Sequence, residues 1–245
     1  MQEQLRQQYL QAMGIQLWES RTQGIPVAQI SSIKKNINSD EPEVAFLDSA
    51  HVEVTKVLPD WQVLQHQVET CQRCGLHESR IYPVFGVGDR NAKLMFVGEA
   101  PGAEEDRKGE PFVGRAGQLL NEMLMAIGFK REQVFIANIL KCRPPNNRDP
   151  HVEEVEACEA YLHAQIQLLQ PTLIVALGRI AAHNLLKTRE SLASLRGQLH
   201  HGSGFNVPVV VTYHPAYLLR TPLEKRKAWA DLQWLLEILK SEETV

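Results

Sequence analysis

The chain has 245 residues and a formal net charge of −3; hydrophobic residues make up 44% of it and charged residues 22%. This composition is ordinary for a globular protein and excludes a disordered or fibrous chain, and the length suits one domain with an extension better than two equal domains. Because the charges nearly balance, any surface that binds nucleic acid must be local. No apolar run reaches the roughly 18 residues of a membrane span, and residues 1–16 are too polar for a signal sequence, so we predict a cytoplasmic protein.

The first sixty residues differ from the rest of the chain. A short helical pattern over residues 5–19 is followed by a polar stretch, residues 31–42, that has no sustained periodicity. We therefore predict an N-terminal helical peptide with a flexible linker over residues 1–60 and one globular domain over residues 61–245.

From residue 93 onward, short apolar runs alternate with longer amphipathic segments. The apolar runs predict buried strands over residues 94–97, 134–139, 173–177 and 207–213. Helical spacing of apolar residues predicts helices over residues 116–127, 152–169, 179–186 and 223–239. This alternation predicts an α/β fold of three layers, αβα, around a central four-stranded parallel sheet.

In such sheets ligands bind beyond the carboxyl ends of the strands, so the residues after each predicted strand are candidates for a site. These residues are polar or rich in glycine and proline: 98–102 after the first strand, Asn138 at the end of the second, 178–179 after the third and 214–215 after the fourth. We expect the four loops to converge on one crevice.

The four cysteines are candidate metal ligands. They are Cys71, Cys74, Cys142 and Cys158, and the first two form a CxxC pair. A reducing compartment does not favour disulfides, whereas four thiolates can hold either a tetrahedral zinc ion or a [4Fe-4S] cluster, and the spacing does not choose between them. Four unconnected buried thiols are one alternative. A redox CxxC pair is another, but it leaves the last two cysteines unexplained.

Residues 98–115, GEAPGAEEDRKGEPFVGR, form a second candidate site. Glycine and proline occur where the backbone must turn sharply or approach a ligand, beside the carboxylates of Glu99 and Glu105. By itself the segment also fits a solvated acidic turn. Phe112 fits either a core position or an aromatic ring that stacks on a nucleic-acid base.

The motifs CxxC, GEAPGAEED, GEPFVGRAGQLL, FIANILKCRPPNNR, LGR and HPAYLLR follow one another in the chain. In this order they resemble the family 4 uracil-DNA glycosylases of bacteria, from Cys71 to about Trp234. The resemblance implies the uracil-DNA glycosylase fold and an enzyme that flips uracil out of DNA, hydrolyses its N-glycosidic bond and leaves an abasic site. It also implies that the four cysteines bind a [4Fe-4S] cluster rather than zinc.

The resemblance further implies roles for three residues around the uracil. Phe112 matches the aromatic residue that stacks on the base. Asn138 matches the amide that reads the base edge, because a carboxamide offers both a donor and an acceptor. His214 matches the histidine that hydrogen-bonds a uracil carbonyl while negative charge develops on the departing base.

Two carboxylates are candidates for the base that activates the attacking water. By the resemblance, Glu99, Ala100 and Pro101 match the loop around the uracil and the water. Ala100 stands where better-known relatives carry the aspartate that activates water. The choice of base is therefore left open between Glu99 and Glu105, and Glu105 is alternatively a wall against the methyl group of thymine.

Contacts with DNA are predicted from HPAYLLR and from scattered basic residues. Leu218 and Leu219 resemble the loop that enters the minor groove, and Arg220 resembles a phosphate contact; the alternative places both leucines in the core. Local positive surface is also expected from basic residues near the strand ends: Lys141, Arg143, Arg148, Arg179 and Arg196.

The N-terminal segment, residues 8–21, resembles the peptide by which the psi subunit of the bacterial replicase docks on the clamp loader. This resemblance implies clamp-loader subunits of DNA polymerase III as partners of residues 1–30. It raises an alternative function: a replisome adaptor on a glycosylase-like scaffold with weak or no activity. A zinc-stabilised nucleotide-binding protein fits the sheet but not the motifs. We predict a monomer that is associated with the nucleoid.

Overall fold

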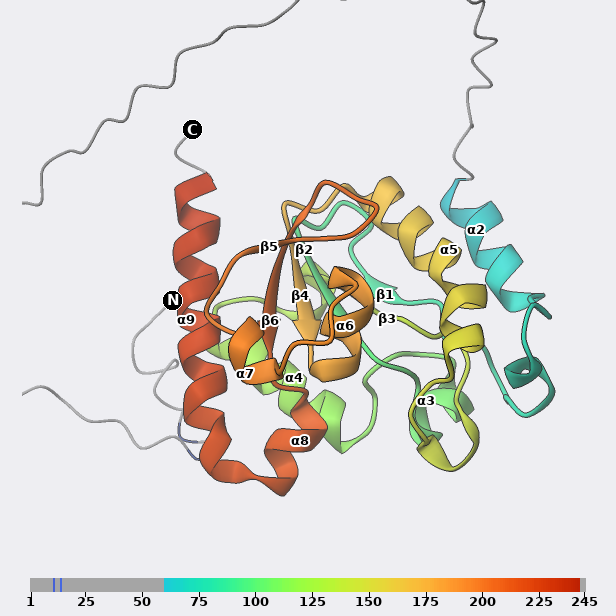
Figure 1. The fold of residues 1–245 in the computed structure, drawn as a ribbon, viewed down its shortest axis with the longest axis horizontal. Helices are drawn as coiled ribbons and strands as arrows, with labels where there is room; N and C mark the ends of the chain where they lie inside the picture. The colour runs from blue at the N-terminus through green and yellow to red at the C-terminus, as the bar shows by residue number, and fades with distance from the viewer. Residues whose placement is uncertain (1–10, 12–13, 15–59, 243–245) are drawn as a thin grey trace, which may run out of the picture. The chain divides into compact units, whose positions relative to one another are not determined.

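The structure is a computed structural model that describes residues 11, 14 and 60–242 (Figure 1). Most of the predicted N-terminal peptide and linker, including the segment 8–21 apart from Gln11 and Gly14, lies outside the described residues. The predicted domain is described from its start to Glu242. None of the helices in this part of the chain is long and apolar enough to cross a membrane.

A mixed sheet forms the middle layer of the domain. Its strands are β1 (Val87–Gly88), β2 (Leu94–Gly98), β3 (Phe135–Asn138), β4 (Leu173–Leu177), β5 (His200–His201) and β6 (Pro208–Thr212). They are arranged in the order β1-β3-β2-β4-β6-β5. The inner four are parallel, whereas β1 pairs antiparallel with β3 and β5 pairs antiparallel with β6. The predicted four-stranded parallel sheet is therefore the centre of a six-stranded mixed sheet.

The two edge strands, β1 and β5, were not predicted. Each has only two residues, which is too short for a periodic pattern. They pair with the outer edges of β3 and β6. All four parallel strands are thereby paired on both sides, which protects their backbone hydrogen-bonding groups.

The sheet separates two hydrophobic cores because successive side chains of a strand point to opposite faces. In β2, Met95 and Val97 belong to one core and Leu94 and Phe96 to the other. All four are at most 1% exposed. Strands that are covered on both faces need apolar residues at every position, and this is the pattern by which the inner strands were predicted.

Helices contribute to both cores, which confirms the three-layer arrangement. One core contains side chains of α2 (Trp61–Glu69), α5 (Val152–Leu169), α6 (Arg179–Leu186) and α7 (Leu192–Leu195). The other contains side chains of α4 (Arg115–Ala126), α8 (Pro215–Arg220) and α9 (Lys225–Glu242). The connections hold α3 (Ala103–Lys108) and the 3₁₀ turns η1 (Gly75–Glu78), η2 (Arg131–Gln133), η3 (Pro145–Asn147) and η4 (Pro222–Glu224). The predicted helices over residues 152–169 and 179–186 coincide with α5 and α6.

The carboxyl ends of the parallel strands lie at the lower edge in Figure 1, beside α8 and the loop that contains η3. The chain segments after β2 and β3 stay hydrogen-bonded to each other past the strand ends: Ile139 N donates to Gly98 O over 2.9 Å, and Leu140 N donates to Glu99 O over 3.0 Å. These bonds hold the first two site loops together.

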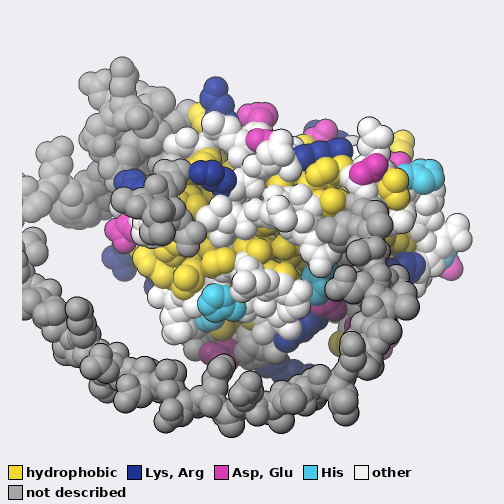
Figure 2. Space-filling model, turned by 90° about the horizontal axis from the view of Figure 1, so that it is seen from above, with side chains coloured by type: hydrophobic (Ala, Val, Ile, Leu, Met, Phe, Trp, Pro, Cys, Tyr) yellow, Lys and Arg dark blue, Asp and Glu magenta, His cyan; other side chains and the backbone are white. Residues whose placement is uncertain are grey.

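Figure 2 views the molecule from above Figure 1, onto the opposite edge of the sheet. On the described part of that face, Lys and Arg side chains are interspersed with Asp and Glu, and hydrophobic side chains lie between them. Positive charge therefore does not gather on the visible, described part of this face.

Candidate active site

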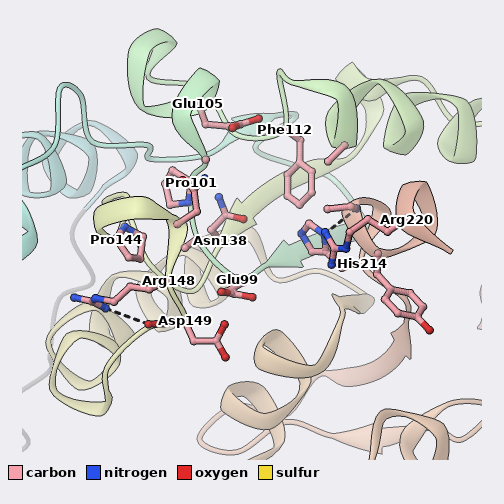
Figure 3. A pocket seen from close by; sticks show the side chains of 16 residues that line it. Glu99, Pro101, Glu105, Phe112, Asn138, Pro144, Arg148, Asp149, His214 and Arg220 are labelled. Carbon is pink, nitrogen blue, oxygen red and sulfur yellow. Dashed lines mark hydrogen bonds between the residues drawn. The ribbon is translucent and has the colours of Figure 1, made fainter.

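A cavity of about 420 Å³ opens at the carboxyl ends of the parallel strands (Figure 3). Loops that follow β2, β3 and β6 line its walls. The residues predicted for the site that line this cavity are Glu99, Ala100, Pro101, Glu105, Phe112, Asn138, His214 and Arg220. The fold thus brings together residues that are up to 121 positions apart in the chain, from 99 to 220.

Asn138 carries an unsatisfied acceptor at the base of the cavity. It is the last residue of β3 and only 1% exposed. Its Oδ1 has no hydrogen-bond partner among the described residues. A buried amide oxygen without a donor costs about 1–3 kcal/mol, so the arrangement calls for a ligand that brings an N–H or O–H group to this atom.

Phe112 lies beside Asn138 in a backbone conformation that non-glycine residues rarely adopt, with φ of 53°. Glu105 holds this loop, because its Oε1 accepts hydrogen bonds from Val113 N and Gly114 N, each 2.9 Å long. The ring of Phe112 lies 5.5 Å from the ring of His214, centroid to centroid. Strain of this kind recurs at functional sites, where the surroundings enforce it.

His214 is held in one tautomer. Its Nδ1 accepts a hydrogen bond from Ala216 N, 3.1 Å away, and so caps α8. Because Nδ1 is the acceptor, a neutral ring carries its proton on Nε2 and can donate from there. Burial lowers the pKa of His214 to about 4, with a smaller contribution from Arg220, so the ring is neutral at pH 7.

The loop after β4 supports His214 from behind instead of lining the cavity. Gly178 has φ of 87°, and a β-carbon at this position would lie 2.8 Å from Cβ of His214. Only glycine allows both the left-handed backbone and this close approach. Three of the four predicted loops therefore form the wall, and the fourth positions one of its residues.

Glu99 has an unusual acidity for a carboxylic acid. Its pKa is raised to about 7, mainly by burial and in part by the nearby charge of Asp149, while Arg179 opposes the shift. Arg179 and Asp149 form an ion pair of 3.1 Å. A carboxyl group that titrates near neutral pH is suited to exchange a proton with water.

The four cysteines line a second, smaller cavity. Cys142 and Cys158 are buried, and Cys71 and Cys74 are half-buried. Arg80 donates from Nη1 to Cys142 Sγ over 3.0 Å, and Lys141 N donates to Cys158 Sγ over 3.3 Å. None of the four forms a disulfide. No three Cys, His, Asp or Glu side chains in the described part of the chain are arranged to hold a single metal ion.

Lys141 is buried between the two cavities, and this corrects the prediction that it contributes to a positive surface. It is 1% exposed, and its Nζ donates to Asn138 O over 2.9 Å and to Gln165 Oε1 over 2.7 Å. Burial lowers the pKa of Lys141 to about 8. Arg196 is likewise engaged inside the protein, because it forms an ion pair of 2.8 Å with the buried Asp231.

Residues 85–233 match the family model of the uracil DNA glycosylase superfamily. The chain is 44% identical over 178 residues to a type-4 uracil-DNA glycosylase of Archaeoglobus fulgidus, covering 70% of this chain and 89% of the relative. It is 46% identical over 179 residues to a type-4 enzyme of Pyrobaculum aerophilum, covering 71% and 91%. A type-4 enzyme of Thermotoga maritima is 45% identical over 184 residues, covering 74% and 95%.

The chain belongs to the type-4 uracil-DNA glycosylases. The predicted family and fold are thereby confirmed. In this glycosylase the matched residues 85–233 include the whole wall of the larger cavity and two of the four cysteines, Cys142 and Cys158. Neither the structure nor these relatives support the predicted contact with clamp-loader subunits.

The predicted DNA-inserting leucines need a correction. Leu218 is 1% exposed and belongs to the core beside α4 and α9, so it cannot enter DNA. Leu219 is partly buried against the same core. The segment was predicted as a loop but forms α8, because Pro215 starts the helix and the His214 side chain caps it. The exposed side chains here are Tyr217, at 37%, and Arg220.

The loop from residue 143 to residue 149 contributes cavity residues; sequence reasoning missed Asn147 and Asp149 among them, and expected Arg148 only as positive surface. Asn147, Arg148 and Asp149 line the cavity, and Arg148 forms a bidentate pair with Glu154 over 2.9 and 2.6 Å. Arg143, which was predicted to bind DNA, donates to Asn147 Oδ1 over 2.7 Å. The available signal was the motif NNRDP, residues 146–150, in the segment that connects the predicted strand 134–139 to the predicted helix 152–169; only its arginine was considered, as a source of positive charge.

Proposed function

We propose that this chain hydrolyses the N-glycosidic bond of uracil in DNA, releasing free uracil and leaving an abasic site. The observation that carries the proposal is the unpartnered, buried Oδ1 of Asn138 in the wall of the cavity that Phe112 and His214 also line. Uracil supplies the missing donor from its imide N–H. A base inside a duplex can enter such a cavity only after its nucleotide is flipped out of the stack.

The proposed recognition of uracil follows from the groups around it. Phe112 stacks on the base, Oδ1 of Asn138 accepts from the imide N–H, and Nδ2 of Asn138 donates to the adjacent carbonyl. Cytosine presents an acceptor and an amino group at these two positions, so both contacts would be mismatched. A site built to satisfy a buried polar group strongly rejects a ligand that leaves it unpaired.

We propose that His214 stabilises the departing base. When the bond between C1′ of the sugar and N1 of uracil breaks, its electron pair leaves with the base and negative charge spreads to the carbonyl oxygens. The neutral ring donates from Nε2 to one of them. A donor that is fixed in place before reaction acts without reorganisation, which is the basis of electrostatic stabilisation.

We propose that Glu99, rather than Glu105, orients the attacking water and accepts its proton as the water oxygen bonds to C1′. Glu99 is half-buried in the cavity wall and has a pKa of about 7. One oxygen of Glu105 is already occupied by two backbone N–H groups. The role proposed for Glu105 is to hold Phe112 in place and to close the pocket against the methyl group of thymine.

We propose that Cys71, Cys74, Cys142 and Cys158 hold a [4Fe-4S] cluster. The four thiols face one cavity, and N–H donors lie 3.0 and 3.3 Å from two of the sulfurs, as suits thiolates that carry negative charge. Four thiolates suit a zinc ion as well, and the likeness of the motifs to those of the family 4 enzymes is what favours the cluster. Hydrolysis needs no electron, so the cluster would serve as a structural crosslink.

The proposed DNA contacts lie on both sides of the cavity. Arg220 and Arg148 are on its rim, on α8 and on the loop that contains η3. Leu223 in η4 is 88% exposed, directly after this rim, and we propose that it takes the place in the duplex that was predicted for Leu218. Clamp-loader binding by residues 1–30, a monomeric state and a cytoplasmic location near the nucleoid stay predictions.

The test uses the iron-replete full chain with two duplexes that differ only in one uracil-for-thymine replacement. Alkaline treatment cleaves DNA at abasic sites. We expect strand cleavage at the uracil position alone, and loss of that cleavage in Asn138→Ala. Intact uracil strands after incubation with metal-replete protein would refute the proposed function.

A further inference from the structure

Lys141 is a buried lysine that no step of the proposed reaction uses. It is among the largest fully buried side chains. An ammonium group removed from water must satisfy its N–H donors inside the protein. Two of the donors of Lys141 Nζ are satisfied by neutral oxygens, the backbone carbonyl of Asn138 and the side chain of Gln165.

The main chain of the same residue belongs to the cysteine site. Lys141 N donates to Cys158 Sγ over 3.3 Å, and Cys142 follows directly in the chain. Lys141 O accepts a hydrogen bond of 2.7 Å from Val84 N, which fixes the peptide on its other side. A change in position of either sulfur is therefore transmitted to the Lys141 backbone.

The side chain of Lys141 closes a short ring with the residue proposed to read uracil. Between Asn138 and Lys141 there are only two residues, Ile139 and Leu140. Their backbone N–H groups donate to the last residue of β2 and to the residue after it. The contact from Nζ fixes the carbonyl of Asn138 and with it the direction in which its side chain leaves the backbone. Hydrogen-bond recognition requires such a group to be held within about 0.5 Å.

We propose that Lys141 is a positioning residue that couples the cysteine site to uracil recognition by holding the Asn138 peptide with its ammonium group and the Cys158 sulfur with its backbone N–H. This inference rests on the proposed function. Thiolates bound to iron would place negative charge beside the ammonium group and so favour its burial. Filling the cysteine site would then set how well the pocket distinguishes uracil from cytosine, the base whose edge mismatches the Asn138 carboxamide.

Two neighbouring residues provide matched controls. Arg80 donates to Cys142 Sγ over 3.0 Å and to Glu69 O over 3.1 Å, so it contacts the cysteine site on the side of α2. Gln165 accepts from Lys141 Nζ and donates to Phe85 O over 2.8 Å. Arg80→Met removes a contact to a cysteine, and Gln165→Met removes a buried partner of Lys141, while both leave the contact between Lys141 and Asn138 in place.

The experiment measures selective affinity instead of turnover. A duplex with one 2′-fluoro-deoxyuridine, whose glycosidic bond resists cleavage, is compared with the same duplex carrying 2′-fluoro-deoxycytidine, each base standing opposite a mismatched thymine. The ratio of the two dissociation constants is determined for iron-replete wild type, Lys141→Met, Gln165→Met and Arg80→Met. Iron content and the visible absorption band are recorded for each protein.

We expect Lys141→Met to lower the ratio by about tenfold or more, as for the loss of one buried charged hydrogen bond, and the two controls to stay within about twofold of wild type. An unchanged ratio in iron-loaded Lys141→Met would overturn the inference. A wild-type ratio near one would instead refute the proposed function, so the two failures are distinguishable.

A second measurement keeps the inference testable if Lys141→Met does not fold. Hydrogen exchange of the amides of Ile139 and Leu140 is compared in wild-type protein before and after iron is removed. We expect exchange at these two amides to accelerate more than at the amide of Val210 in β6. The side chain of Val210 belongs to the other hydrophobic core. Equal acceleration at all three amides would contradict the coupling.

Discussion

Gly98 leaves the space in which Asn138 and Phe112 meet. A β-carbon at position 98 would lie 2.4 Å from Oδ1 of Asn138 and 2.6 Å from Cζ of Phe112. Both distances are below contact distance, and neither neighbour is the free end of a flexible chain. The absence of a side chain at the end of β2 is therefore a condition for the proposed uracil site.

Gly98→Ala should displace the Asn138 carboxamide or the Phe112 ring. Because a misplacement of about 1 Å can cost 100-fold in rate, we expect kcat/KM on a uracil duplex to fall by about 100-fold or more. Gly75→Ala is the control, since a β-carbon at that position meets no atom within 4 Å. Steady-state kinetics of both variants decide the matter, and a Gly98→Ala enzyme with wild-type rates would contradict the geometry.

His214 should stay neutral throughout the physiological pH range, since burial lowers its pKa to about 4. We expect ¹⁵N NMR between pH 5 and 8 to show the tautomer protonated at Nε2. Because folding lowers this pKa below the ordinary 6.5, its contribution to the free energy of unfolding is complete above pH 6.5 and is lost as the pH falls toward 4.

Replacement of His214 tests its electrostatic role. His214→Ala should lower kcat by about 10²–10³, the range for loss of one fixed donor to a developing anion. His201→Ala, at an exposed position in β5, should leave kcat unchanged. An imidazolium signal at pH 6 would be incompatible with the proposed neutral donor.

Glu99 should govern the pH dependence of kcat/KM. Its pKa is raised to about 7, and the deprotonated form is the one that can accept a proton, so the rate should rise as the pH increases through 7. Glu99→Gln should lower the rate by about 10²–10⁴ and abolish this limb. A profile in Glu99→Gln with the same limb would assign the titration to another group.

Two charged neighbours of Glu99 test the direction in which each of them shifts its pKa. The charge of Asp149 raises the pKa of Glu99, so Asp149→Asn should move the limb to lower pH. Arg179 lowers this pKa, so Arg179→Gln should move the limb to higher pH. Shifts of both variants in the same direction would show that the loop had rearranged and would count against the electrostatic explanation.

Alanine variants of Leu218 and Leu223 should differ in their effects: the first should lower the stability of the fold, and the second should weaken cleavage of duplex DNA. Leu218→Ala should lower the free energy of unfolding by about 2–5 kcal/mol, because the side chain is 1% exposed. Leu223→Ala, at a position 88% exposed, should leave it within about 0.5 kcal/mol. The same variant should lower cleavage of uracil in a duplex but not in a single strand, which has no stack to enter. Equal rates for Leu223→Ala and wild type on the duplex would remove Leu223 from the DNA interface.

The sequence by itself determined the parallel strands at the centre of the sheet, the three layers of the fold and the loops that carry the candidate site. Buried parallel strands need apolar residues at every position, and in amphipathic helices the apolar residues recur about every 3.6 residues. The strands β2 and β4 and the helices α5 and α6 could therefore be predicted from the sequence. The family motifs then led to Phe112, Asn138 and His214, which do line one cavity.

Only the tertiary structure decided which residues are buried and what they contact. Lys141 was predicted to lie on a positive surface, and Leu218 was predicted to enter the minor groove. Both are only 1% exposed, because burial depends on elements distant in the chain. The edge strands are too short to leave a pattern. The raised pKa of Glu99 comes mainly from burial and in part from the charge of Asp149, fifty positions away. Both depend on distances in space, which the order of residues does not encode.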